Sequence, residues 1–327
     1  MRLDGRELVN FSSNDYLGLA WHPEVRAAYG EGGGAGSARL ISGNRPAHDL
    51  LEAALAEKLG RPVLLFSSGY HANLALLGTV PEAGDVVVSD ALNHASIIDG
   101  LRLSKARRVV LPHDHPSQIP ADARLVVVEG LYSMDGDTPD LCRWTGDHWL
   151  AVDEAHALGA LGPQGRGVAA MQGVEPDFMV GTLGKALGVA GAFVAGPAAL
   201  RELLISQGRA FIYTTGMPEP VALAALVALR LADDERRERL AQNARRLRQG
   251  LQQVGARVLG AHHVVPIVTR ERTMAAAARL LKEGIYAPGI RFPTVPQGQE
   301  RVRFTVCSEH SPEQVDRCID AVATALR

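Results

Sequence analysis

The sequence predicts an α/β fold built on a mainly parallel β-sheet. Short apolar runs recur through the first two thirds of the chain, and most are separated by enough residues for a helix. Seven of these runs have the length of strands: residues 63–66, 85–88, 108–111, 125–128, 149–152, 178–180 and 192–195. Continuous apolar character is typical of strands that are buried on both faces. We therefore expect a doubly wound, seven-stranded sheet flanked by helices.

Other elements precede and separate these strands. Residues 8–11 could form a strand before a turn-prone segment at 12–15, and the glycine-rich stretch 31–36 is too flexible for a regular element. Helical apolar spacing marks residues 48–58 and 71–77. We expect an N-terminal arm, residues 1–35, followed by a large domain, residues 36–232.

Residues 233–327 are expected to form a smaller C-terminal α+β domain. Its charged run at 233–239 is most simply the solvated face of a helix with internal ion pairs. The elements predicted after it are a strand at 264–268, a helix at 274–283, a strand at 302–306 and a helix at 312–326.

Composition limits the classes of function. The formal net charge is −2, from 34 basic and 36 acidic residues spread along the chain, which gives no support to a nucleic-acid partner. The apolar runs are too short or too interrupted to span a bilayer, and the N-terminus lacks the apolar core of a signal peptide. The cysteines Cys142, Cys307 and Cys318 have no CxxC spacing, which fits a reducing compartment. We expect a cytoplasmic enzyme without a membrane partner.

Three side chains that could take part in catalysis follow predicted strands. Asp153 and His156 come after the run 149–152, and Lys185 lies between glycines after the run 178–180. Open α/β sheets bind ligands at the carboxyl ends of their strands. A lysine that bonds covalently, an aspartate that keeps a pyridine nitrogen protonated and a histidine that reaches a ring hydroxyl are the parts of a pyridoxal phosphate site. Each residue alone also has a plain explanation, as a solvated loop lysine or as acidic residues at a helix start.

A phosphate site is predicted where the first strand leads into a helix. Ser68, Gly69 and Tyr70 stand at that junction, so backbone amides would point at an anion on the helix N-terminus. The alternative is an ordinary turn with a serine N-cap.

No metal site is expected. His113 and His115 flank Asp114 after a strand, but histidines so placed diverge and no further ligands cluster with them. The run 134–137 has too few ligands for a calcium loop and is expected to be a tight turn.

Nine sequence blocks, in order along nearly the whole chain, carry a family resemblance. They are residues 10–18, 36–43, 66–70, 93–96, 129–137, 152–156, 164–167, 182–185 and 293–296. In these blocks the sequence resembles the α-oxoamine synthases, which are fold-type I pyridoxal phosphate enzymes. The resemblance implies the same seven-stranded fold and a homodimer that shares its active sites.

The resemblance also implies roles for single residues. It makes His94 the ring that stacks on the cofactor, although a capping or partly buried histidine is the alternative. The residues it implies at the cofactor are Ser68, Gly69, Tyr70, His94, Ser133, Asp153, His156, Thr182, Lys185, Thr214 and Thr215, the last two in a segment that crosses to the neighbouring subunit. Those implied at the substrates are Asn14, His94, Glu129, Arg291 and Thr294, with Arg291 as a bidentate clamp on a carboxylate.

The reaction that the resemblance implies is a decarboxylative condensation of an amino acid with an acyl thioester. Lys185, Asp153, His94 and His156 are the implied catalytic residues. Residues 10–23, 162–167 and 290–296 favour the member that joins L-alanine to a pimeloyl thioester, from coenzyme A or a carrier protein. Members that use glycine or serine remain alternatives, because a single methyl group is worth only about 1–3 kcal/mol of discrimination. A catalytically silent scaffold is the alternative from another class.

Family members commonly have a longer N-terminal extension that contacts substrate, so we expect that contact to be absent or replaced here.

Overall fold

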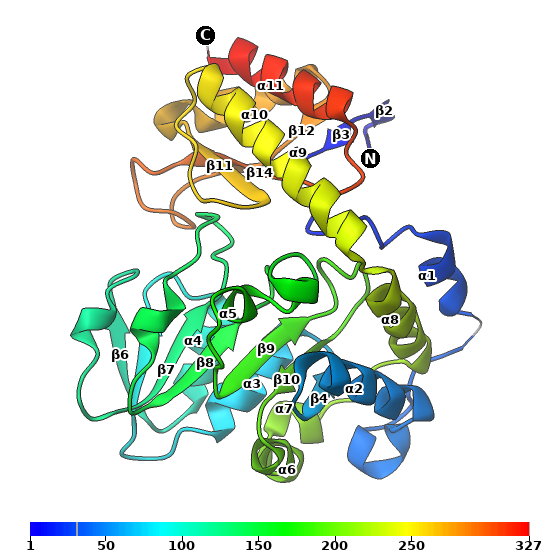
Figure 1. Ribbon diagram of the computed structural model, residues 1–327, viewed down its shortest axis with the longest axis vertical. Helices are drawn as coiled ribbons and strands as arrows, with labels where there is room; N and C mark the ends of the chain where they lie inside the picture. The colour runs from blue at the N-terminus through cyan, green and yellow to red at the C-terminus, as the bar shows by residue number, and fades with distance from the viewer. Residues whose placement is uncertain (31, 327) are drawn as a thin grey trace. The chain divides into compact units, whose positions relative to one another are not determined.

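The computed structural model describes residues 1–30 and 32–326 (Figure 1). The chain divides into two compact units. One comprises residues 19–131 and 139–232, and the other comprises residues 1–18, 132–138 and 233–327. Glu31, the first residue of the predicted glycine-rich stretch, lies outside the described residues, as does Arg327.

The larger unit is built on a seven-stranded sheet with the order β4-β10-β9-β8-β7-β5-β6. Its strands are β4 (Val63–Phe66), β5 (Val86–Asp90), β6 (Arg107–Leu111), β7 (Ala123–Glu129), β8 (Trp149–Asp153), β9 (Phe178–Thr182) and β10 (Ala192–Ala195). Strands β9, β8, β7, β5 and β6 pair in parallel, and β10 pairs antiparallel with β4 and β9. The predicted mainly parallel, seven-stranded sheet is therefore confirmed.

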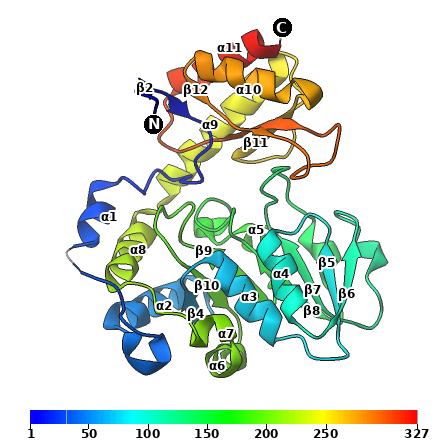
Figure 2. The ribbon, with the colours of Figure 1, turned by 180° about the vertical axis from the view of Figure 1, so that it is seen from behind.

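Helices flank this sheet. They are α1 (Pro23–Ala28), α2 (Pro46–Leu59), α3 (Gly69–Thr79), α4 (Ala95–Leu103), α5 (Val168–Met171), α6 (Ala198–Gln207), α7 (Arg209–Ile212) and α8 (Glu219–Leu231). Figure 2 shows the sheet from the side of α3 and α4. Buried residues of α3, such as Leu76, pack with Val87 of β5 and Val127 of β7 in the core.

Two connections between strands contain no α-helix. Residues 112–122 and 130–148 contain only the 3-10 turns Pro116–Gln118 and Leu141–Trp144 instead of α-helices. Prolines 112, 116 and 120 explain the first of these, because proline lacks the N–H that a helix interior needs. The segments that leave the ends of β6 and β7 are thus not followed by long covering helices.

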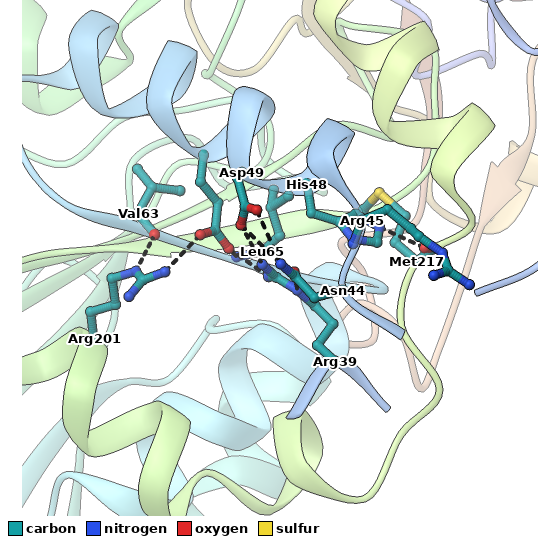
Figure 3. A network of polar contacts seen from close by, with 10 residues as sticks. Arg39, Asn44, Arg45, His48, Asp49, Val63, Leu65, Arg201 and Met217 are labelled. Carbon is teal, nitrogen blue, oxygen red and sulfur yellow. Dashed lines mark hydrogen bonds and ion pairs between the residues drawn. The ribbon is translucent and has the colours of Figure 1, made fainter. Parts of the chain in front are cut away.

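The free edge of β4 is covered by an ionic network centred on the buried Glu52 (Figure 3). Glu52 of α2 accepts a hydrogen bond from the backbone N–H of Leu65 at 3.0 Å, and Arg201 donates to the carbonyl oxygen of Val63 at 3.1 Å. Arg39 and Arg201 both pair with the Glu52 carboxylate, at 2.5 Å and 2.9 Å. Side chains therefore occupy backbone groups through which an exposed edge strand could pair with another chain.

The smaller unit contains the other elements. They are β1 (Arg2–Leu3), β2 (Arg6–Glu7), β3 (Val9–Asn10), α9 (Asp234–Gln253), β11 (Val264–Val268), α10 (Thr273–Lys282), β12 (Ile285–Tyr286), β13 (Gly289–Ile290), β14 (Arg301–Thr305) and α11 (Pro312–Leu326). The predicted division differs here in two places. Residues 1–18 join this unit because β3 pairs in parallel with β12, and residues 132–138 join it through Gly136, whose carbonyl oxygen accepts the N–H of Ala261 at 3.0 Å.

Candidate active site

Asp153 ends β8 and is only 6% exposed. Its Oδ2 atom accepts a hydrogen bond from Asn73 Nδ2 at 2.7 Å, and its Oδ1 atom accepts the backbone N–H of Ala155 at 2.9 Å. Two donors therefore fix the plane of this carboxylate and compensate its charge in a buried place. Asn73 belongs to α3, so a helix as well as a strand determines how Asp153 is oriented.

His94 is connected to Asp153 through two side chains. Asn73 Nδ2 also donates to Ser96 Oγ at 2.9 Å, and Ser96 Oγ lies 2.8 Å from His94 Nδ1. The backbone N–H of Ser96 donates to the same Nδ1 atom at 3.2 Å, so Nδ1 is an acceptor and the ring proton belongs on Nε2. Burial lowers the pKa of His94, the Asp153 carboxylate partly opposes this shift, and the Lys185 ammonium adds to it. The ring is therefore neutral at neutral pH.

Glu129 ends β7 directly beside Asp153, with which it is in register. Its Oε1 atom accepts the backbone N–H of His94 at 2.6 Å. Burial raises the pKa of Glu129 well above its ordinary value, the Asp153 carboxylate raises it further, and Lys185 opposes the shift. Two adjacent buried carboxyl groups thus favour sharing a single negative charge, with the proton on Glu129.

Lys185 lies in the loop that connects β9 to β10. The loop is folded tightly on itself, because the Leu183 N–H bonds Gly191 at 2.9 Å and the Gly188 N–H bonds the Lys185 carbonyl oxygen at 2.8 Å. The Thr182 hydroxyl donates to Gly191 and accepts from the Gly184 N–H, which also shapes this loop. Since the Lys185 charge acts on the pKa values of His94 and Glu129, these groups share one electrostatic environment.

The N-terminus of α3 leaves room for an anion. The Ser68 hydroxyl caps the helix by accepting the His71 N–H at 3.2 Å, as the plain alternative anticipated. Gly69 and Tyr70 are the first two residues of the helix, so their amides have no acceptor within it. A Cβ atom added at Gly69 would meet no atom within 4 Å. Cap and phosphate cradle are therefore compatible, and the donor set fits the phosphate of the predicted cofactor.

Other predicted residues lie farther along the same unit. His156 is buried, three residues beyond Asp153. The Tyr70 hydroxyl bonds the Asp99 carboxylate. Thr214 and Thr215 follow the short helix α7, and Thr215 is exposed. Their roles at the cofactor stay predictions.

Four predicted residues belong to the smaller unit. Asn14 Oδ1 accepts the Tyr16 hydroxyl at 3.2 Å, and Asn10 Oδ1 accepts the Ser12 N–H at 2.9 Å at the start of the turn-prone segment. The Ser133 carbonyl oxygen accepts Arg303 Nε at 2.5 Å. Arg291 and Thr294 are exposed and joined by a backbone hydrogen bond of 3.0 Å. Their contacts with substrate or cofactor stay predictions.

Three buried polar residues beside the candidate site were not identified from the sequence. Asn73 and Ser96 form the link between Asp153 and His94, and Glu154 accepts the N–H groups of Val168 and Ala169 at 2.9 Å and 2.7 Å. A polar residue directly before the apolar run Leu74–Leu77 of α3 was the available signal for Asn73. Burial raises the pKa of Glu154 to about 7, although these two donors lower it.

The histidines after β6 have structural partners. His113 Nδ1 bonds Asp90 Oδ1 at 3.0 Å, and His115 Nδ1 contacts the His113 carbonyl oxygen at 2.6 Å. Within residues 1–30 and 32–326 no three His, Cys, Asp or Glu side chains are grouped as metal ligands. No helix in the described part of the chain is long and apolar enough to cross a membrane.

Comparison with known proteins identifies the family. The family model for aminotransferases of class I and II matches residues 6–322. The 8-amino-7-oxononanoate synthases of Nitrosococcus oceani and Methylococcus capsulatus are each 44% identical to this chain, with 100% and 99% of this chain and 93% and 90% of the relative covered.

Solved structures share the fold. Serine palmitoyltransferase of Sphingomonas wittichii superposes with a TM-score of 0.94 at 32% identity, covering 98% of this chain and 88% of that one. The 8-amino-7-oxononanoate synthase of Francisella tularensis superposes with a TM-score of 0.84 at 28% identity, covering 97% of each chain. With the buried carboxylates, the histidine and the loop lysine grouped at the strand ends, these matches show that the chain belongs to the class I and II aminotransferase family, as a pyridoxal phosphate-dependent acyltransferase of fold type I.

Proposed function

We propose that this enzyme condenses L-alanine with a pimeloyl thioester, with loss of carbon dioxide, to form 8-amino-7-oxononanoate, a step of biotin synthesis. The observation that carries the proposal is the buried group of Asp153, Glu129 and His94 beside the charge of Lys185. Relatives that carry this synthase's name match the whole chain at 44% identity, which supports the choice of reaction.

The residues have distinct roles in this proposal. The cofactor, when bound, supplies an electron sink for the carbanion that forms on the amino acid. Lys185 would bond its aldehyde carbon, Asp153 would hold a proton on its pyridine nitrogen, and the N-terminus of α3 would bind its phosphate.

The proton transfers follow from the charges in the site. The Lys185 amine would take the proton from the substrate α-carbon. His94 is a neutral ring and can lie against the cofactor face without adding positive charge that would compete with the protonated pyridine nitrogen. Glu129, in its protonated form, leaves the single negative charge on Asp153, where the pyridinium needs it.

Substrate contacts are proposed from the smaller unit and from a second subunit. Arg291 binds the carboxylate of a substrate as a bidentate clamp, and Asn14 and Thr294 line the same site. The active form is a homodimer, in which Thr214 and Thr215 reach the neighbouring subunit's cofactor phosphate. We place the enzyme in the cytoplasm.

A panel of substrates tests the proposal. Alanine, glycine and serine are each combined with pimeloyl, acetyl, succinyl and palmitoyl thioesters, and the release of free thiol is measured. The expected result is fastest release with alanine and the pimeloyl donor, together with restored growth of a biotin-requiring strain that lacks this step. A clear preference for glycine with acetyl or succinyl donors would contradict it.

Serine palmitoyltransferase activity is the second candidate. It is favoured by the TM-score of 0.94 to that enzyme, which exceeds the 0.84 to the solved synthase. The same panel separates the two, because this candidate requires serine with the palmitoyl donor to give the fastest thiol release.

A further inference from the structure

A rigid loop presents Arg166 on the larger unit. The loop is folded on itself by hydrogen bonds from the Gly159 N–H to the Gly165 carbonyl oxygen at 2.7 Å and from the Gly167 N–H to the Leu161 carbonyl oxygen at 2.9 Å. Gly165 and Gly167, on either side of Arg166, have φ angles of +71° and +102°, which side chains with a Cβ atom rarely adopt. The backbone that carries Arg166 is therefore closely constrained.

Arg166 lines a cavity of about 180 Å³ together with Arg61, which follows the C-terminus of α2. Arg61 Nη1 donates to the Pro176 carbonyl oxygen at 2.5 Å, and this bond holds the second guanidinium at the cavity. Arg166 Nε is buried and has no hydrogen-bond partner among residues 1–30 and 32–326. A buried N–H group without an acceptor is costly, so this donor is available for a ligand.

The charges around the cavity are unbalanced. Glu175 is the one carboxylate residue among the described residues that line it, and it is exposed. Across residues 1–30 and 32–326, neither Arg61 nor Arg166 forms an ion pair. Other lining residues, such as Ala169 and Met179, are apolar and carry no charge that offsets the two guanidinium groups.

We propose that this cavity is a binding site for a phosphoryl oxyanion. Guanidinium groups match phosphate oxygens with paired N–H donors, and the unsatisfied Arg166 Nε supplies one of them. The site is separate from the cradle at the N-terminus of α3, which the cofactor phosphate fills in the holoenzyme. Its ligand is either free phosphate or a phosphoryl group carried by a larger molecule such as coenzyme A.

Calorimetric titration of the holoenzyme with inorganic phosphate, at ionic strength held constant with chloride, tests the site. We expect saturable binding that Arg166→Gln and Arg61→Gln each weaken by about tenfold or more. Arg166→Lys should also weaken it, because lysine keeps the charge but loses the planar fork. Arg108→Gln is the matched control, because Arg108 is exposed on β6 and its replacement removes the same charge away from the cavity.

The outcomes separate the possibilities. Absence of saturable binding to the wild-type enzyme, or an equal loss in the Arg108 control, would overturn the proposal.

Titration with coenzyme A and with dephospho-coenzyme A then identifies the source of the phosphoryl group. A loss of coenzyme A affinity in both arginine variants indicates a phosphoryl group of that molecule, and a loss confined to inorganic phosphate indicates the free anion. Neither result depends on which amino acid the enzyme uses. If Arg166→Gln fails to fold, as judged by circular dichroism, the Arg61 and Arg166→Lys variants still decide.

Discussion

Asn73 and Asp153, 80 residues apart in the sequence, are joined by a 2.7 Å hydrogen bond from Nδ2 to Oδ2. The bond connects the helix that begins at the phosphate cradle to the carboxylate that ends β8. Through Ser96 the same amide group also reaches His94. One amide group thus sets the geometry between the proposed pyridine-nitrogen partner and the proposed stacking ring.

Asn73→Ala should lower kcat about tenfold or more while the protein remains folded. A hydrogen bond to a charged group is worth about 1.5–3 kcal/mol, and without it the Asp153 carboxylate is free to turn. Steady-state kinetics with the preferred substrates measure the effect. Asn243→Ala is the matched control. Asn243 lies in the smaller unit, and its amide donates to the carbonyl oxygens of Cys307 and His310 in that same unit. An equal fall in kcat for both variants would show that Asn73 acts only through stability.

Glu154 should make stability depend on pH. Its folded-state pKa of about 7 lies above the ordinary value of 4.5, so the folded protein holds the proton more tightly than the unfolded chain does. This contribution to stability is present below about pH 4.5 and is lost as the pH rises to about 7.

Chemical denaturation of wild type and Glu154→Gln is measured across this pH range. Because Glu129 shifts the unfolding free energy with pH in the same direction in both proteins, the difference between them isolates the contribution of Glu154. The difference in unfolding free energy between the two proteins should change by about 3 kcal/mol at most. A difference that stays constant from pH 4.5 to pH 7 would contradict the assignment.

Glu52→Gln should destabilise the larger unit by about 3 kcal/mol, because it removes the negative partner of Arg39 and Arg201 in a buried place. Denaturant unfolding gives the value. Glu24→Gln removes an exposed pair with Arg230 and should cost less than about 1 kcal/mol. Equal losses of unfolding free energy in the two variants would show that the network at the edge of β4 stabilises the protein no more than an exposed ion pair does.

The sequence was sufficient for the sheet because buried strands leave continuous apolar runs, as in Val63–Phe66. The sequence also predicts Asp153 and Lys185 as site residues, because both follow such strands. Asn73 was missed because its function depends on a contact across 80 residues, and local pattern carries no signal for that. The pairing of β3 with β12 was missed for the same reason, so residues 1–35 were expected to form a separate arm, whereas residues 1–18 belong to the smaller unit.

Lys185→Ala should lower kcat by at least about 10³-fold without unfolding the protein, because no other group supplies an amine in that loop. Turnover and circular dichroism are measured together. Lys105→Ala, at an exposed position, serves as the control and should retain full activity.

The most direct test of the account is to reduce the holoenzyme with borohydride and to map the modified peptide by mass spectrometry. The lysines of the chain are Lys58, Lys105, Lys185 and Lys282, so the outcome is unambiguous. The account predicts a pyridoxyl group on Lys185 and on none of the others. A group on Lys58, Lys105 or Lys282, or no modified lysine in a protein that has bound the cofactor, would contradict it.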